Sequence, residues 1–300
     1  MPKPKYEPTQ SFTMQEDDFF GEFYLPPQNR FPGKCVILFG GSAGKFLLTQ
    51  LQACCFVDAG MSAMAISYHG APGLPKDLKE QPVDVIEHAA LWLKKQGYEK
   101  VGVWGISMGG ELALLAGSLL PELISCVVAV APLEMVMQAQ TAGERPTDGS
   151  SFSFHGSALP FAKFIPQDSK TWFREYIKQS WQHKEPYTRE LLLRAYAAND
   201  VPEAVIPTWN ISGPVLLLGG GMDGMCPNVE SFAAIQKRMQ AHKFAYPLEV
   251  HLYPHLGHFV LPFKPYTTKA LWAERHYPQE CDVERTQSWQ DTLTFLREVW

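Results

Sequence analysis

The fold of this chain is decided by the stretch Val101-Gly102-Val103-Trp104-Gly105-Ile106-Ser107-Met108-Gly109-Gly110. Its first residues form a short apolar run, which is typical of a strand buried on both faces. An Ala- and Leu-rich segment with helical period follows over residues 108–119. A serine with a glycine two residues away on each side, between a strand and a helix, is the pattern of a nucleophile elbow. We therefore expect a sharp turn that holds the Ser107 hydroxyl clear of the sheet.

Further apolar runs lie on both sides of this stretch and alternate with segments of helical period. Residues 19–25 alternate aromatic and polar side chains, which predicts a half-exposed antiparallel strand. Strands that alternate with helices specify a mostly parallel sheet flanked by helices, so we expect an α/β chain with the α/β-hydrolase fold. The apolar runs occupy residues 35–39, 63–67, 126–130 and 215–218, and a further strand, with alternating side chains, is expected over residues 248–253. The helical segments occupy residues 46–59, 83–95, 229–242 and 283–300.

One long segment, residues 132–209, interrupts this alternation. It shows no buried-strand pattern, but a loop rich in Ser, Gly and Phe followed by amphipathic helical stretches. We expect a lid-like or cap insertion after the sixth strand of the fold, inside a single domain that spans residues 1–300. Its aromatic side chains suit either a cover over an apolar cleft or packing of the insertion onto the sheet. They are Phe152, Phe154, Phe161, Phe164, Trp172, Phe173, Tyr176 and Trp181.

Serine is a poor nucleophile at neutral pH, so the elbow requires a base and an acid elsewhere in the chain. Asp223 ends the run Gly219-Gly220-Gly221-Met222-Asp223, just after the apolar run 215–218, and His258 lies just after the run 248–253. Serine, then acid, then histidine is the order of the α/β hydrolases. We expect His258 to act as general base and Asp223 to orient it, the alternative being that all three are ordinary turn and loop residues.

The same fold also predicts two backbone N–H groups that stabilise the oxyanion formed during acyl transfer. One belongs to Met108, at the start of the helix that follows the elbow, where the helix dipole favours an anion. The other should come from the loop after the run 35–39, where we choose Gly41, with Ser42 as the alternative.

Three other signals are weaker, so we expect neither a cofactor nor a metal. Residues 40–45 resemble a phosphate loop, but Phe39 occupies the first glycine position and Phe46 the Ser or Thr position. Residues 219–224 match GxGxxG, but late in the chain and close to a proline, which argues against a dinucleotide site. The three histidines of residues 251–258 have no carboxylate or cysteine at metal-ligand spacing.

Composition limits the partners. The 300 residues are 46% apolar and 19% charged, with a net charge of −5 and no run of like charges, so a nucleic-acid partner is not expected. No segment resembles a signal peptide or is apolar enough to cross a membrane, which favours the cytoplasm. The six cysteines lack CxxC spacing and fit buried thiols. A small-molecule substrate is expected, and the oligomeric state is left open.

Several stretches resemble one known family. The most specific is Ile211-Ser212-Gly213-Pro214-Val215-Leu216-Leu217-Leu218, and Leu38-Phe39-Gly40-Gly41-Ser42-Ala43-Gly44 also looks similar. The chain resembles the C-terminal catalytic domain of the acyl-CoA thioester hydrolases and bile acid-CoA:amino acid N-acyltransferases, which are dienelactone-hydrolase-like α/β hydrolases. The resemblance implies that Ser107, Asp223 and His258 are the triad and that the substrate is a thioester or a related acyl compound.

We therefore expect a serine hydrolase that cleaves acyl thioesters or carboxylic esters through an acyl-enzyme. Two alternatives remain open: an N-acyltransferase that moves the acyl group from CoA to an amino acid, and a non-catalytic binding protein on a hydrolase fold. An oxygen ester on Ser107 is less reactive toward amines than a thioester would be, so hydrolysis is favoured. Met108 stands where many members of the family have lysine.

Overall fold

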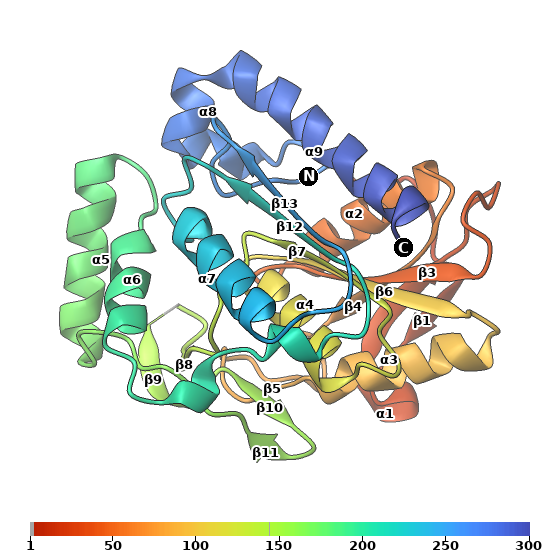
Figure 1. The fold of residues 1–300 in the computed structure, drawn as a ribbon, viewed down its shortest axis with the longest axis horizontal. Helices are drawn as coiled ribbons and strands as arrows, with labels where there is room; N and C mark the ends of the chain where they lie inside the picture. The colour runs from red at the N-terminus through yellow and green to blue at the C-terminus, as the bar shows by residue number, and fades with distance from the viewer. Residues whose placement is uncertain (1–2, 144) are drawn as a thin grey trace.

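The computed structural model describes residues 3–143 and 145–300. An eight-stranded sheet runs through the middle of these residues, with the spatial order β1-β2-β4-β3-β6-β7-β12-β13 (Figure 1). β2 pairs antiparallel with β1 and β4, and every other pairing in this sheet is parallel, so the predicted sheet is confirmed. The strands are β1 (Gln10–Phe12), β2 (Phe20–Tyr24), β3 (Lys34–Phe39), β4 (Ser62–Ser67), β6 (Lys100–Ile106), β7 (Cys126–Val130), β12 (Val215–Gly220) and β13 (Leu248–Tyr253).

Helices cover both faces of the sheet. Apolar side chains of α3 (Asp84–Lys95), α4 (Met108–Leu119) and α7 (Asn228–Ala241) pack on one face, and those of α2 (Phe46–Asp58) and α9 (Pro278–Glu298) pack on the other. In β3, Ile37 packs with the apolar side chains on the first face of the sheet, and the next residue, Leu38, packs with those on the second face. Burial on both faces is why the parallel strands appear in the sequence as continuous apolar runs.

The last helix differs from its prediction. It begins at Pro278, five residues before the expected start, and ends at Glu298. Proline is well suited to the first turn of a helix, because its missing N–H would have no partner there. Trp300 lies beyond the helix and is only 6% exposed, packed in the cluster under α9. Two short helical segments, η3 (Tyr266–Ala270) and α8 (Trp272–His276), precede α9, and α1 (Met14–Asp17) precedes β2.

The segment 132–209 contains more strand than its sequence predicted. In place of a plain loop there are two small sheets, made by β8 with β9 and by β10 with β11 and β5. These strands are two to five residues long, which is too short for a periodic pattern to reveal them, and β10 also pairs with the distant β5. Their bounds are β5 (Gln81–Pro82), β8 (Gln138–Gln140), β9 (Pro146–Ser150), β10 (Phe152–Phe154) and β11 (Ser157–Ala158).

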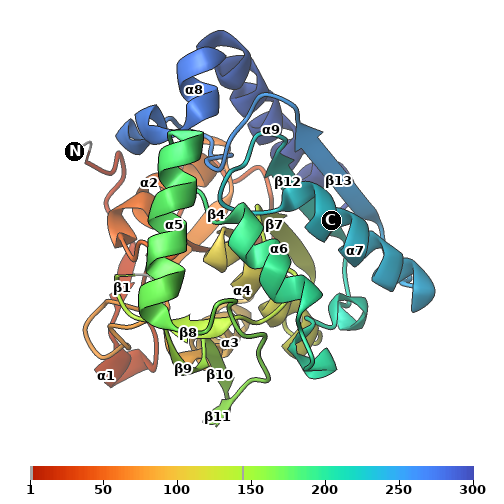
Figure 2. The ribbon, with the colours of Figure 1, turned by 90° about the vertical axis from the view of Figure 1, so that its left-hand side faces the viewer.

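Two helices follow within the same segment, α5 (Ser169–His183) and α6 (Arg189–Ala197), with the single turns η1 (Pro202–Ala204) and η2 (Thr208–Asn210) after them. Figures 1 and 2 show α5 and α6 side by side at one edge of the molecule. Phe164, Trp172 and Leu191 join a third apolar cluster with residues of the loop after β7. Trp181, in contrast, is 81% exposed. The aromatic side chains of the segment therefore have no single role.

The six cysteines are free thiols, and five of them are buried. Within residues 3–143 and 145–300, no helix combines the length and the apolar character that a membrane crossing requires. The cytoplasmic location stays a prediction.

Candidate active site

Ser107 lies at the turn between β6 and α4, with a backbone φ of 60°. Its N–H donates to the Val130 carbonyl at 2.8 Å. A Cβ at Gly105 would lie 2.0 Å from the Gly109 carbonyl oxygen, and a Cβ at Gly109 would lie 2.2 Å from the Gly40 carbonyl oxygen. Neither position can hold a side chain, so the glycine spacing of the motif follows from the tight packing of this turn. The turn places Ser107 immediately before the first residue of α4.

Asp223 lies in the loop after β12 and is 5% exposed. One carboxylate oxygen accepts hydrogen bonds from the backbone N–H groups of Met225 (2.7 Å) and Cys226 (2.9 Å). The other accepts from Asn228 Nδ2 at 3.0 Å and lies 2.9 Å from His258 Nδ1. These contacts compensate the burial of the carboxylate and fix its orientation. With the Nδ1 proton directed at Asp223, His258 keeps Nε2 free to accept a proton.

The electrostatics of His258 follow from this pair. The imidazole is 3% exposed, and burial alone would lower its pKa. The adjacent Asp223 carboxylate, together with the Cys226 side chain, outweighs burial and raises the pKa of His258 above the ordinary value of 6.5. Burial raises the pKa of the neighbouring Cys226 thiol, which keeps this thiol neutral at neutral pH. His258 is therefore a stronger base than a free imidazole.

The loop that carries His258 is anchored to α9. The Glu284 carboxylate accepts hydrogen bonds from the backbone N–H groups of His255 (2.8 Å) and Leu256 (2.9 Å), and lies 2.7 Å from His255 Nδ1. The Cys281 thiol, one turn earlier on α9, donates to the His255 carbonyl at 3.1 Å. These contacts hold the residues just before His258 in place. No sequence pattern indicates this role, because Glu284 lies in a helix whose exposed face is polar, as most surface helices are.

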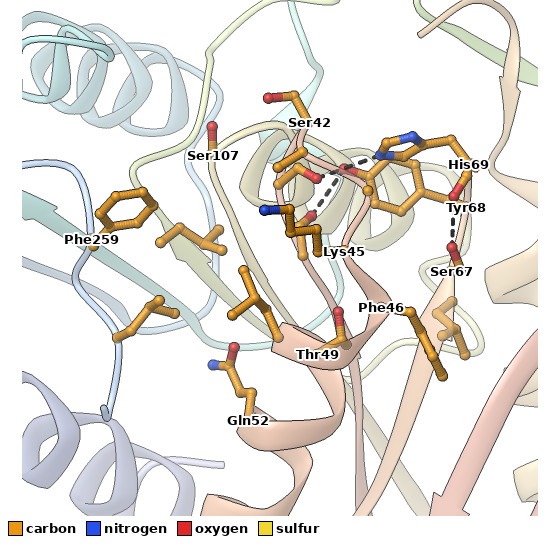
Figure 3. A pocket seen from close by; sticks show the side chains of 18 of the residues that line it. Ser42, Lys45, Phe46, Thr49, Gln52, Ser67, Tyr68, His69, Ser107 and Phe259 are labelled. Carbon is orange, nitrogen blue, oxygen red and sulfur yellow. Dashed lines mark hydrogen bonds between the residues drawn. The ribbon is translucent and has the colours of Figure 1, made fainter. Parts of the chain in front are cut away.

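A cavity of about 150 Å³ has both Ser107 and His258 in its wall. It lies between the loop after β3, the start of α2 and the residues around Phe259, and Figure 3 shows Ser107 and Phe259 facing it. Lys45 also lines the cavity and is exposed. Among the hydrogen bonds of the described residues, none joins the Ser107 hydroxyl to His258. The base and the nucleophile thus share one cavity, with Asp223 behind the base.

A second, smaller cavity of about 70 Å³ lies on another side of Ser107. Its walls are mostly apolar and come largely from the segment 132–209, so this segment lies next to the nucleophile. The apolar side chains in its wall are those of Met108, Leu133, Met137, Phe164, Trp172, Leu191, Leu192 and Met225.

The loop after β3 passes directly beside the nucleophile. A Cβ at Gly41 would lie 3.2 Å from Ser107 Cβ, so the Gly41 backbone is in close contact with the serine. The Tyr68 hydroxyl donates to the Gly40 carbonyl at 2.9 Å, and His69 Nε2 lies 3.5 Å from the Gly41 carbonyl oxygen (Figure 3). Burial lowers the pKa of His69, which is therefore neutral at neutral pH. Two side chains from the end of β4 thus position this loop.

Glu111, one helical turn after Ser107, is fully buried. Its backbone N–H donates to the Ser107 carbonyl at 3.0 Å. Burial raises the pKa of its carboxyl group well above the ordinary value of 4.5. A neutral carboxyl group places no negative charge behind the start of α4, where an oxyanion would bind.

Sequence spacing did not indicate one group of possible metal ligands. Asp223, Cys226 and His258 offer ligand atoms within 4.8 Å of one another, because the loops after β12 and β13 bring together residues up to 35 positions apart. Both Asp223 oxygens already accept hydrogen bonds, which is the arrangement of an acid that orients a histidine. A second group, Asp84, Glu87 and His155, lies toward the surface, where His155 Nε2 is 2.8 Å from Glu87.

The sequence of this chain is similar to those of a known protein family. A family model described as "BAAT / Acyl-CoA thioester hydrolase C terminal" matches residues 82–299, which include Ser107, Asp223 and His258. The chain is 27% identical over 292 residues to Acyl-coenzyme A thioesterase 2, mitochondrial, of Mus musculus, covering 91% of this chain and 56% of that protein. It is 28% identical over 247 residues to Acyl-coenzyme A thioesterase 1 of Homo sapiens, covering 81% of this chain and 52% of that protein. The chain thus spans about half the length of these relatives.

Solved structures confirm the fold. A putative dienelactone hydrolase from Klebsiella pneumoniae subsp. pneumoniae matches with a TM-score of 0.55 at 14% identity, covering 93% of each chain. The alpha/beta hydrolase GrgF from Penicillium sp. sh18 matches with a TM-score of 0.52 at 16% identity, covering 94% of each chain. The predicted α/β-hydrolase fold is therefore correct.

Proposed function

Because this chain belongs to the family of BAAT and acyl-CoA thioester hydrolase C-terminal domains, we propose that it is a serine hydrolase that cleaves acyl thioesters such as acyl-CoA. Ser107 is the nucleophile, His258 the general base and Asp223 the residue that orients it. In this proposal residues 1–300 form one catalytic domain, with residues 132–209 as its lid.

One observation carries the proposal. A histidine bonded to a buried carboxylate at 2.9 Å shares a cavity with a serine on a strained strand-to-helix turn. Each part alone is common in proteins. Their combination in the chain order serine, aspartate, histidine supports acyl transfer through a covalent intermediate.

The first half-reaction forms the acyl-enzyme. His258 Nε2 takes the Ser107 proton while Oγ attacks the carbonyl carbon, and the carbonyl oxygen becomes an oxyanion. In this proposal the N–H groups of Met108 and Gly41 donate to this oxyanion, and each such donor contributes roughly 3 kcal/mol in comparable sites. The carbon–sulfur bond then breaks, and the imidazolium returns the proton to the leaving thiolate. The free thiol departs, and the acyl group stays on Ser107 as an oxygen ester.

The second half-reaction returns the enzyme to its starting state. His258 takes a proton from water, and the hydroxide attacks the ester carbonyl. The carboxylic acid leaves when His258 returns the proton to Ser107. An amine acceptor could replace water, but an oxygen ester reacts with amines less readily than a thioester does, so hydrolysis is favoured.

The two cavities beside Ser107 suggest where the two parts of a thioester bind. We place the acyl chain in the smaller apolar cavity, between α4 and the segment 132–209. The thiol arm then occupies the cavity that holds Lys45, whose ammonium group is available for a phosphate. The neutral His69 and the apolar Phe259 in this cavity suit an uncharged arm next to the nucleophile.

The test is the release of free thiol from acyl-CoA of graded chain length, with p-nitrophenyl esters of the same acids in parallel. We expect thiol release by the wild type and none by Ser107→Ala. If neither substrate class is turned over although Ser107 reacts with a fluorophosphonate, the substrate assignment is wrong. Adding glycine or taurine and searching for an amide by mass spectrometry distinguishes hydrolysis from N-acyl transfer. A folded protein whose serine does not label would instead be a binding protein.

A further inference from the structure

The outward face of α5 carries an unusual set of exposed side chains. These residues follow one another along the chain at spacings of one, three or four positions, so the helical period of 3.6 residues places all of their side chains on one side of the helix. Ile177 is 51% exposed and Trp181 is 81% exposed, although large apolar side chains usually avoid water. This outer face consists of Lys170, Arg174, Ile177, Lys178, Trp181 and, just after the helix, Lys184.

The charge of this outer face is entirely positive. Among the described residues, the four basic side chains of the face make no ion pair within 4.0 Å. The acidic residues nearest to them along the chain are Asp168, at the N-cap near Lys170, and Glu175, three residues before Lys178. The whole chain has a net charge of −5, so the rest of the molecule is acidic. The positive charge of α5 is therefore local, and the two apolar side chains lie among the basic ones.

The inner face of α5 already has a packing role. Trp172 is 3% exposed and belongs to the third apolar cluster, with Phe173 and Tyr176 packed against it. Trp172 also lines the small cavity beside Ser107. The stability of the fold therefore depends on the inner face, and burial in the core does not explain Ile177 and Trp181. Figure 2 shows α5 at the surface, with the remainder of the chain behind it.

Another exposed aromatic side chain lies in a segment near the C-terminal end of α5. Arg275 Nη2 donates to the Lys184 carbonyl at 2.5 Å, which brings η3 and α8 next to the end of α5. In η3, Tyr266 is 83% exposed, and Lys269 Nζ lies 4.9 Å from the centre of its ring. A second exposed aromatic side chain is thus paired with a basic one in a segment near the C-terminal end of α5.

We infer that the outer face of α5 binds the surface of an anionic lipid membrane without crossing it. Lysine and arginine are attracted to anionic headgroups, and tryptophan prefers the boundary between headgroups and acyl chains. The convex surface of a helix has no groove for a peptide, but it can lie flat on a lipid surface. Docking in this orientation would bring the segment that lines the apolar cavity to the membrane, where substrates with long acyl chains accumulate.

The experiment is co-sedimentation of the full chain with vesicles of phosphatidylcholine alone or mixed with phosphatidylglycerol, at low and high salt. We expect binding to the mixed vesicles only, and its loss at high salt. Lys178→Glu removes one positive charge and adds one negative charge, so it should weaken binding by about 25-fold, at about fivefold per charge. Trp181→Ser should weaken it by about tenfold. The matched controls Lys95→Glu and Tyr246→Ser alter exposed residues outside α5 and should bind as the wild type does.

Three results would overturn the inference: no vesicle binding by the wild type, equal loss in the controls, or equal binding to neutral and anionic vesicles. Self-association of the wild type without lipid that Trp181→Ser abolishes would also overturn it, because the occupant would then be a second copy of the chain. Ser107→Ala should bind vesicles as the wild type does. This readout separates membrane binding from the proposed hydrolase activity, which Ser107→Ala should abolish.

Discussion

Replacing Asp223 by asparagine tests the proposed roles within the site, because the change preserves shape and removes only the charge and two acceptor positions. In the wild type, one carboxylate oxygen accepts from the backbone N–H groups of Met225 and Cys226. In Asp223→Asn the amide oxygen would keep these two contacts. The new NH₂ group would then face Asn228 Nδ2 and His258 Nδ1, the two donors that the other oxygen served. An NH₂ group cannot accept a hydrogen bond from either one.

The magnitude follows from the tautomer of His258. To pair with the new NH₂ group, Nδ1 must become the acceptor, which moves the proton to Nε2. His258 can then no longer take the proton of Ser107. The same change in a serine protease lowers kcat about 10⁴-fold, so we expect a loss of about 10³- to 10⁴-fold in kcat, or about 4 to 5.5 kcal/mol of barrier.

The assay is thiol release from acyl-CoA under saturating conditions, with circular dichroism to show that the variant is folded. Asn228→Ala is the matched control, because it removes one donor from the same carboxylate oxygen and leaves the contact with His258 intact. We expect this control to retain activity within about tenfold of the wild type, because His258 keeps its carboxylate partner and therefore its tautomer. If folded Asp223→Asn also stays within about tenfold of the wild type, Asp223 does not orient the base.

Three further predictions concern pH, chain length and the His258 loop. Because Asp223 raises the pKa of His258, and catalysis needs the neutral imidazole, kcat/KM should fall as the pH decreases through a midpoint above 6.5. This midpoint should move to lower pH in Asp223→Asn, and a wild-type midpoint below 6.5 would contradict the assignment. Leu192→Trp narrows the apolar cavity beside Ser107, so kcat/KM should fall at least about tenfold more for long-chain than for short-chain acyl-CoA. Equal losses of kcat/KM for both chain lengths would show that the acyl chain binds elsewhere. Glu284→Ala leaves two backbone donors of the His258 loop without their acceptor. This change should lower kcat about tenfold with KM little changed, and it should reduce the free energy of unfolding by about 1 to 3 kcal/mol. The control Glu280→Ala alters an exposed residue of the same helix and should change neither kcat nor the free energy of unfolding.

The sheet was predictable because its central strands are buried on both faces. Such strands appear as continuous apolar runs, and β3, β4, β6, β7 and β12 lie where those runs are. The edge strand β13 is only partly buried and lies where alternating side chains predicted a strand. β1 was missed, since it has three residues and only Phe12 is buried. The strands β8 to β11 were missed because each has only two to five residues, and because β10 also pairs with β5, which is distant in sequence. Local patterns therefore predict the parts of the fold whose stability depends on continuous burial.

Some residues of the candidate active site could be predicted from the sequence, and others could not. The sequence indicated Ser107 by its motif, and Asp223 and His258 by chain order and by their positions after strands. It could not indicate Asn228, because an asparagine at the start of a helix is usually a capping residue rather than a partner of the acid. Glu284 was missed for a related reason, since its contact with the His258 loop joins segments 28 and 29 residues apart. Roles that depend on the contact of a helix with a distant loop can be recognised only in the structure.

Reaction with a fluorophosphonate, followed by mass spectrometry of the peptides, tests the nucleophile most directly. We predict a single adduct on Ser107 of the folded protein, with much slower labelling in His258→Ala. An adduct on a different residue, or a folded wild-type protein that does not react, would contradict the assignment of Ser107 as the nucleophile.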